Sequence, residues 1–139
     1  MQISDQFNSS HTKGTRLTRV RATLTHILKS DHGPFSVAEL LQRLRVRGLR
    51  ANKTTVYRQL EFFRREDLIK EVNLGEKQSR YEWSERDHHH HVVCLKCRKV
   101  EAVRLSENLQ RQERFIEQEK KFIINHHELE FFGLCRKCQ

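Results

Sequence analysis

Eight side chains that bind metal ions well are concentrated in two short segments of this sequence. The first segment begins with four consecutive histidines, His88 to His91, and continues to Cys94 and Cys97, while Cys135 and Cys138 lie near the C-terminus. The four cysteines form two Cys-x-x-Cys pairs, and 37 residues separate the pairs. Two such pairs supply the four thiolates that hold a structural Zn²⁺ ion in a tetrahedral site. The sequence therefore predicts a zinc site made of all four cysteines.

Two disulfides or a redox-active pair are the alternatives for these cysteines. Disulfides persist in exported proteins, and the chain has no apolar signal segment, so we expect a cytoplasmic protein with reduced thiols. A redox motif needs only one Cys-x-x-Cys pair. No apolar run approaches the length of a membrane span. A zinc site is the interpretation that uses both pairs.

The four histidines cannot all reach one ion. The two valines that follow them are β-branched and apolar, which predicts a strand, and alternate side chains of a strand point to opposite faces. One face should therefore carry His89 and His91, and the other His88 and His90. Each pair forms half of a metal site and needs partners from elsewhere in the chain. A solvated histidine tract or a tag remnant is the alternative, but the run is internal and lies close to the cysteines.

Three helical patterns occupy the first half of the chain. Apolar residues with a 3.6-residue period predict a helix from about Leu17 to Leu28. Ser36 and Glu39 have the spacing of a capping box, which starts a second helix. Asn52 is a favourable N-cap for a third helix. Three short helices with tight connections are typical of a helix-turn-helix.

A hairpin pattern follows the helices, with strands over 68–74 and 79–83 around a polar turn. Helices followed by a hairpin predict a winged helix, whose third helix enters the major groove of DNA. Arginine can contact guanine through two hydrogen bonds, tyrosine can contact thymine methyl groups or phosphate, and threonine and lysine can hold the backbone. The residues that we expect to face DNA are Lys53, Thr54, Thr55, Tyr57 and Arg58.

The net charge of +9 is spread unevenly along the chain. Residues 1–83 contain 16 Lys and Arg against 9 Asp and Glu, whereas residues 84–139 contain 11 against 9. A solvated basic surface would explain the excess, and an ordinary half-buried aromatic would explain Tyr57. Combined with the winged-helix pattern, however, the basic N-terminal half favours double-stranded DNA as the partner.

The C-terminal part mixes strand patterns with one helical pattern. A small open sheet exposes an edge and an apolar face, and dimerisation would cover both, so we expect a homodimer. The chain as a whole is predicted to be an α+β protein, with an N-terminal winged helix-turn-helix domain and a C-terminal α/β dimerisation domain. The expected segments are a disordered tail (1–13), a DNA-binding domain (14–84) and a metal-binding dimerisation domain (85–139). The last should contain strands over 99–105, 122–124 and 129–132 and a helix over 106–121.

Several motifs resemble those of the ferric uptake regulator family of metal-dependent bacterial repressors. They are Thr54-Thr55-Val56-Tyr57-Arg58-Gln59-Leu60, Tyr81-Glu82, the run His88 to Cys97, and His127 with Phe131-Phe132-Gly133-Leu134-Cys135 and Cys138. The resemblance implies a homodimer that binds operator DNA under the control of a metal ion, with the four cysteines as its structural zinc site. It also implies that Arg16 reaches an AT-rich minor groove, which is recognised by its shape and potential.

The resemblance further implies two histidine-containing metal sites. The regulatory site joins Glu82 to His89 and His91, with one more histidine from the loop before the second helix. The aligned position is Pro34, which cannot bind a metal, so His32 is the nearest candidate. The additional site is formed by His88, His90 and His127. Its carboxylate is not fixed by the alignment, which gives Gln110, with Glu107 and Glu113 a turn to either side.

Nitrogen and oxygen ligands at the regulatory site favour Fe²⁺ or Mn²⁺, although imidazoles also bind Zn²⁺ well. We expect an iron-responsive repressor of metal homeostasis genes. Zinc-sensing relatives tend to have Asp and Cys where this chain has Lys70 and Ser84. Affinity order alone nevertheless favours zinc, so a zinc-uptake repressor is the first alternative. A peroxide-sensing repressor is the second, although such sensors favour Asp at the position of Glu82.

Two functions from other classes fit single features of the sequence. Two histidines and a glutamate could hold a catalytic zinc ion in a small hydrolase. Because the sequence has no nucleophile or general-base motif, we do not expect an enzyme. The second alternative is a constitutive DNA-binding protein in which zinc is only structural. Such a protein would bind its DNA site whether or not further metal is present.

Overall fold

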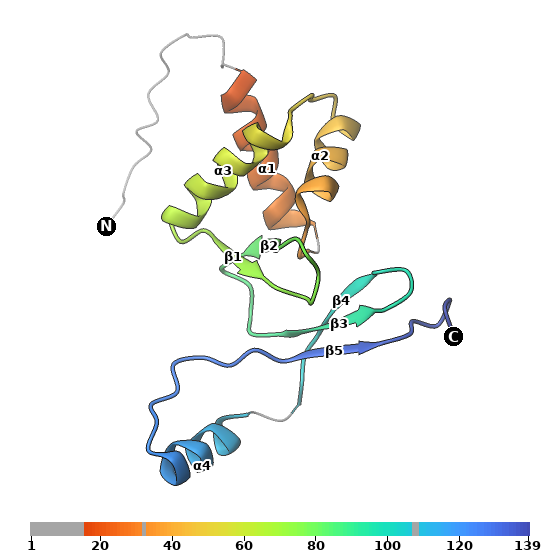
Figure 1. Cartoon of the computed structure of the whole chain (residues 1–139). Helices are drawn as coiled ribbons and strands as arrows, with labels where there is room; N and C mark the ends of the chain where they lie inside the picture. Colours follow the sequence, from red (N-terminus) through yellow and green to blue (C-terminus); the bar gives the residue numbers. More distant parts are fainter. Residues whose placement is uncertain (1–15, 32, 107–108) are drawn as a thin grey trace.

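The structure is a computed structural model that describes residues 16–31, 33–106 and 109–139. Three helices and a two-stranded hairpin precede a three-stranded sheet and a further helix (Figure 1). The elements in chain order are α1 (Arg16–Ser30), α2 (Val37–Val46), α3 (Lys53–Arg65), β1 (Ile69–Val72), β2 (Arg80–Trp83), β3 (His90–Cys94), β4 (Val100–Val103), α4 (Gln110–Lys120) and β5 (Glu130–Gly133). The helical and hairpin predictions for the first half are confirmed.

Local capping groups start two of these helices. At α2 the Ser36 hydroxyl accepts a hydrogen bond from the Glu39 backbone amide, and the Glu39 carboxylate accepts one from the Ser36 amide. At α3 the Asn52 side chain accepts from the Thr55 amide at 2.8 Å. The apolar faces of α1, α2 and α3 then close around one core. Its fully buried members include Val20, Leu24, Ile27, Leu28, Leu40, Leu44 and Val56.

The hairpin β1–β2 is the wing, and it lies between the helices and the C-terminal sheet (Figure 1). Trp83 in β2 belongs to the helical core, where its ring meets Phe63 edge-on with the centroids 6.4 Å apart. Tyr81 packs against the same core and pairs with Phe35 ahead of α2. Since side chains alternate along a strand, Arg80 and Glu82 share the other face of β2. This face looks toward the C-terminal sheet.

The C-terminal sheet has the strand order β4-β3-β5, so β3 is its central strand. The strand β4 pairs with β3 antiparallel, whereas β5 pairs with β3 parallel, opposite Cys94 at Gly133. Because parallel strands end at the same edge, the segments after β3 and β5 leave the sheet side by side. Helix α4 lies apart from the sheet and buries none of its residues (Figure 1).

One expectation about the C-terminal part is wrong, and another is confirmed with shorter bounds. Residues 122–124 do not form a strand, and Ile123 is 86% exposed. The helix expected over 106–121 spans only Gln110–Lys120, and the left-handed φ of 56° at Lys121 turns the chain away. The sequence pattern identified the apolar residues 122–124, but it did not reveal the turn at Lys121 that precedes them. The division of the chain into domains 14–84 and 85–139 stays a prediction. None of the described helices is long and apolar enough to cross a membrane.

Candidate metal centres and DNA-binding surface

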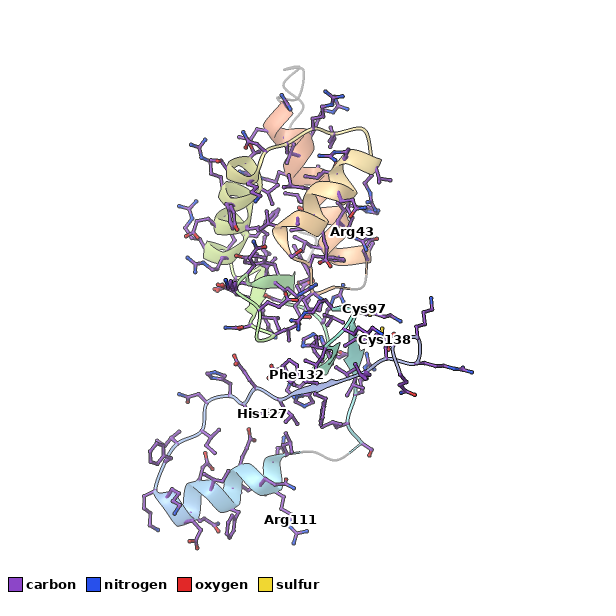
Figure 2. The ribbon with its side chains drawn as sticks, turned by 45° about the vertical axis from the view of Figure 1, so that its right-hand side comes forward. Arg43, Cys97, Arg111, His127, Phe132 and Cys138 are labelled. Carbon is purple, nitrogen blue, oxygen red and sulfur yellow. The ribbon has the colours of Figure 1, made fainter. Side chains whose placement is uncertain are left out.

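The four cysteines meet at one edge of the C-terminal sheet. Cys94 and Cys97 flank the turn after β3, and Cys135 and Cys138 flank the turn after β5; Figure 2 shows Cys97 beside Cys138. All four sulfur atoms lie within 4.8 Å of one another, with 3.7 Å between the Sγ atoms of Cys97 and Cys135. Two sulfurs on a tetrahedral zinc ion, each about 2.3 Å away from it, are about 3.8 Å apart. A disulfide requires about 2.05 Å. The donor set therefore fits Zn²⁺, and the cysteines are free thiols.

Hydrogen bonds within this cluster divide the thiols into two kinds. The backbone amide of Cys135 donates to Cys94 Sγ at 3.4 Å, and this bond, with those from the following turn, lowers the pKa of Cys94 to about 5. Cys138 hydrogen-bonds to Cys135, and this bond, followed by burial, raises the pKa of Cys138 to about 12. Without a cation, the Cys94 thiol is deprotonated at neutral pH, whereas the Cys138 thiol stays protonated. A divalent cation at the centre would stabilise all four thiolates.

Glu82, His89 and His91 form a second cluster between the wing and the sheet. Glu82 lies in β2 of the wing, whereas the histidines belong to β3 and the residue that precedes it. Oε2 of Glu82 lies 3.0 Å from Nε2 of His89 and 3.3 Å from Nε2 of His91. The three ligand atoms fall within 4.8 Å of one another. Two imidazoles and one carboxylate suit Fe²⁺, Mn²⁺ or Zn²⁺ and leave further coordination positions open.

Burial and hydrogen bonds prepare this second cluster for a cation. Glu82 is 6% exposed and His91 is 5% exposed. Burial raises the pKa of Glu82, but the hydrogen bond with His91 and the charges of both histidines outweigh it, so the pKa lies below its ordinary value. His89 donates from Nδ1 to the carbonyl oxygen of Asp87 at 2.7 Å, which fixes its ring with Nε2 directed at Glu82. The site thus presents a buried carboxylate and an imidazole nitrogen already oriented for metal binding.

His88, His90 and His127 form a third cluster on the opposite face of β3. Nε2 of His88 lies 3.1 Å from Nε2 of His127, and the three ligand atoms are within 4.8 Å of one another. Burial, followed by the charges of His88 and His127, lowers the pKa of His90 and favours its neutral, metal-binding form. His127 donates from Nδ1 to Glu113 Oε1 at 2.6 Å. Glu113 therefore stands behind His127 and orients its ring, as carboxylates do around metal-binding histidines.

We expect Glu113→Ala to weaken metal binding at the third cluster by about 10- to 100-fold, the usual effect of losing a carboxylate behind a metal-binding histidine. The measurement is a calorimetric titration with Zn²⁺ of zinc-loaded protein that also carries His89→Ala and His91→Ala, so that the second cluster does not contribute. Glu117→Ala is the matched control, because Glu117 lies on the same helix but bonds the Ile124 amide. Equal affinities in the two variants would rule out this role for Glu113.

The outer face of α3 carries four of the five residues expected to contact DNA. Their side chains are exposed, including Tyr57 at 46%, while Val56 and Leu60 anchor the opposite face in the core. These four residues are Lys53, Thr54, Tyr57 and Arg58.

Thr55 and Arg16 are placed differently from the other expected DNA contacts. Thr55 is half-buried, and its hydroxyl donates to the Asn52 side chain at 2.9 Å, so it supports the N-cap of α3. Arg16 is exposed at the start of α1, and its Nε donates to the carbonyl oxygen of Arg50 at 3.0 Å. This bond places the Arg16 guanidinium beside the N-terminal end of α3.

Arg58→Ala should weaken binding to a specific DNA site by about 1–3 kcal/mol, because an arginine on an exposed recognition helix can form two hydrogen bonds with a base. Fluorescence anisotropy with a labelled duplex gives the affinity. Arg65→Ala removes the same charge from the exposed C-terminal end of α3 and serves as the control. An equal, small loss in both variants would mean that Arg58 contributes only to the general charge.

Some expected residues cannot be placed, and some site residues gave no sequence signal. His32, Glu107 and the tail 1–13 lie outside the described residues. Asp87 acts through its backbone carbonyl, which no side-chain pattern can reveal. Glu113 did leave a signal, since it lies one helical turn from the aligned position Gln110, but only the placement of α4 distinguishes the two.

A winged helix-turn-helix joined to a sheet with three clusters of metal-binding side chains defines a class, the metal-dependent DNA-binding regulators. Within this class, the chain belongs to the ferric uptake regulator family, whose model matches residues 12–132. Members of the family are DNA-binding dimers and are regulators rather than enzymes.

Individual relatives differ in the signal that their names state. The chain is 28% identical over 138 residues to the peroxide-responsive repressor PerR of Staphylococcus saprophyticus, covering 99% of this chain and 92% of that one. The chain is 32% identical in sequence to a zinc-bound manganese uptake regulator of known structure. The match covers 88% of this chain and 92% of that one, with a TM-score of 0.68. The zinc uptake regulator FurB of Mycobacterium tuberculosis is 31% identical, with 91% and 98% covered and a TM-score of 0.51. Family membership therefore leaves the sensed metal open.

Proposed function

We propose that this chain is a transcriptional repressor that binds operator DNA when a metal ion occupies the cluster of Glu82, His89 and His91. One observation carries the proposal: the ligands of this cluster come from two parts of the molecule. Glu82 lies near the end of the wing, whereas His91 lies in the central strand of the C-terminal sheet and His89 directly precedes that strand. A ligand set divided in this way makes the position of the wing depend on whether the site is filled.

The proposed mechanism follows from the geometry of a homodimer. Two recognition helices can enter successive major grooves only when their separation matches the half-site spacing of the DNA. In each protomer the wing packs into the same core as α3, and the sheet carries the expected dimer contacts. A metal that joins Glu82 to the histidines would therefore set that separation. The DNA-competent arrangement must bind the metal more tightly than the alternatives, typically by about 1–3 kcal/mol.

Iron is the metal that we propose for this cluster. Its ligands are nitrogen and oxygen atoms, and the four cysteines of the described chain are committed to the zinc centre. Lys70, which stands where zinc-sensing relatives tend to have Asp, pairs with Glu82 in the hairpin and would not bind a cation while protonated. Because imidazoles also take Mn²⁺ and Zn²⁺, the choice among metals rests on their availability as well as on the ligands.

Peroxide sensing is a second candidate, favoured by the identity to PerR. In this version His89 or His91 would be oxidised when peroxide reacts at an iron-filled site, and DNA would then be released. Mass spectrometry of the peptide that contains the histidine run distinguishes the two functions. A mass increase of one oxygen atom, together with loss of DNA binding, supports peroxide sensing. An unmodified peptide excludes it. The peroxide level is kept low enough that a control protein is not inactivated by general damage.

The test of the proposed function is a metal titration of DNA binding by the zinc-loaded protein under anaerobic conditions. The DNA is a duplex selected from a random pool, and Trp83, the one tryptophan of the chain, reports metal binding by its fluorescence because it adjoins Glu82. Binding switched on by Fe²⁺ or Mn²⁺, but not by Zn²⁺ at buffered cellular levels, supports the proposal. Activation by such low Zn²⁺ indicates a zinc-uptake repressor, and binding that ignores every metal contradicts the regulatory role.

A further inference from the structure

A row of charged side chains connects α2, the wing and the turn that carries Cys97. Arg80 in β2 is 6% exposed, and it donates from Nη1 to Glu39 Oε2 at 2.9 Å and from Nε to Glu76 Oε2 at 3.0 Å. Glu76, in the turn of the wing, also accepts at Oε1 from Nε of Arg98 at 2.9 Å. We call Glu39, Arg80, Glu76 and Arg98 the charge chain. It joins the DNA-binding part to the zinc centre without using any proposed metal ligand.

Both ends of the charge chain are fixed by local structure. Glu39 belongs to the capping box and accepts the Ser36 amide at 2.8 Å, so its carboxylate is held at the start of α2. Arg98 directly follows Cys97, and its amide donates to the Cys94 carbonyl at 2.9 Å. The backbone of Arg98, with φ at 63°, thus closes the zinc-binding turn, while its side chain reaches the wing.

The central carboxylate of the charge chain is well suited to hold two arginines. A hydrogen bond from Arg80 is the main cause that lowers the pKa of Glu76; burial opposes it, and Arg98 adds to it. Glu76 is therefore ionised at neutral pH. Its side chain is 19% exposed and that of Arg98 is 37% exposed, so water screens their ion pair only in part. Apolar contacts support the same junction, since Leu74 is fully buried and Gly75 faces the Phe132 ring.

The charge chain and the proposed regulatory site lie on the same face of the wing. Arg80 and Glu82 are two residues apart on β2, a separation of about 6.6 Å along a strand. The wing therefore has two attachments to the C-terminal sheet: Glu76 to Arg98, which needs no metal, and Glu82 to His89 and His91, which is completed by a metal. With one attachment the wing can rotate relative to the sheet, whereas a second attachment removes most of that freedom.

We infer that Arg98 and Glu76 are positioning residues, whose ion pair holds the wing so that Glu82 stays within reach of His89 and His91. This inference rests on the proposed function of that cluster. When only a fraction of molecules has the binding-competent arrangement, the apparent affinity falls in proportion to that fraction. Loss of the ion pair therefore weakens metal binding at a site whose own ligands are unchanged, and it weakens DNA binding in the same proportion.

The test compares Arg98→Gln with Lys99→Gln in the full-length, zinc-loaded dimer. Lys99 is the next residue and carries the same charge, but its side chain is 60% exposed and pairs with Glu101 in its own hairpin. Titration with Mn²⁺, followed by Trp83 fluorescence, gives the metal affinity, and anisotropy with the selected duplex gives DNA binding. For Arg98→Gln we expect metal binding to weaken by about threefold to tenfold, as for a partly screened ion pair coupled to two sites. Lys99→Gln should bind Mn²⁺ like the wild type.

Each outcome of this test has a defined meaning. If wild-type DNA binding does not depend on metal, the proposed function fails. If it does, but Arg98→Gln binds Mn²⁺ as tightly as the wild type, the inference alone fails. Should Arg98→Gln lose zinc, Glu76→Gln removes the same ion pair from the wing side, together with the bond from Arg80, and leaves the zinc-binding turn intact. Weaker Mn²⁺ binding with full zinc content in Glu76→Gln supports the inference, and wild-type affinity overturns it.

Discussion

Replacing both His89 and His91 by alanine should remove the metal dependence of DNA binding while the fold and the zinc centre persist. Coupling between an effector and a ligand typically amounts to about 5- to 150-fold in affinity, and we expect this whole gain to disappear. The physical reason is that Glu82 alone cannot hold a cation between the wing and the sheet. Anisotropy measurements with the selected duplex, with and without Fe²⁺ or Mn²⁺, give the two affinities.

The matched control for this variant lies on the other face of the same strand. His88→Ala with His90→Ala removes one histidine from β3 and one from the segment just before it, but leaves the proposed regulatory cluster complete. We expect this control to retain a metal-dependent gain in DNA binding. If the variant without His89 and His91 still responds to metal, or if the control loses the response instead, the regulatory site has been assigned to the wrong face of β3.

Cys97→Ser should have the largest effect on stability. The binding of a structural zinc ion contributes an apparent free energy of about 10–16 kcal/mol at neutral pH, which is of the same order as the whole folding free energy of a domain. Serine cannot replace a thiolate in the four-sulfur site. Without zinc, the turns after β3 and β5 lose the bond that joins them, so we expect the C-terminal sheet to unfold and the dimer to dissociate.

Zinc content by elemental analysis and oligomeric state by size-exclusion chromatography test this expectation. Lys96→Ser changes an exposed residue of the same turn and should leave both quantities unaltered. The helices α1 to α3 have their own core, so helical circular dichroism should persist in part. A Cys97→Ser protein that remains a zinc-containing dimer would show that three of the thiolates suffice.

The features that sequence alone predicted well are those set by neighbouring residues. The capping box of Ser36 and Glu39 and the N-cap at Asn52 act within one helical turn, and α2 and α3 begin where they indicate. The alternation of the histidine run needs only a strand, and it correctly separates His89 and His91 from His88 and His90. Spacing alone also grouped the four cysteines, which the structure brings together.

Features that depend on distant contacts were out of reach. The parallel pairing of β5 with β3 joins segments about forty positions apart in the sequence, and no local pattern specifies such a register. Arg80, Glu76 and Arg98 read as ordinary surface charges, although Arg80 is buried and bridges two carboxylates. The contact between Glu113 and His127 depends on the position of α4, which no local pattern specifies.

The most direct test is the affinity of the regulatory cluster for Mn²⁺, measured by Trp83 fluorescence with and without saturating duplex DNA. If the metal stabilises the DNA-competent arrangement, thermodynamic linkage requires DNA to tighten metal binding by the same factor by which metal tightens DNA binding. We predict equal factors of about 5- to 150-fold in the wild-type protein, with no such change in the variant without His89 and His91. A metal affinity that DNA leaves unchanged would contradict the account.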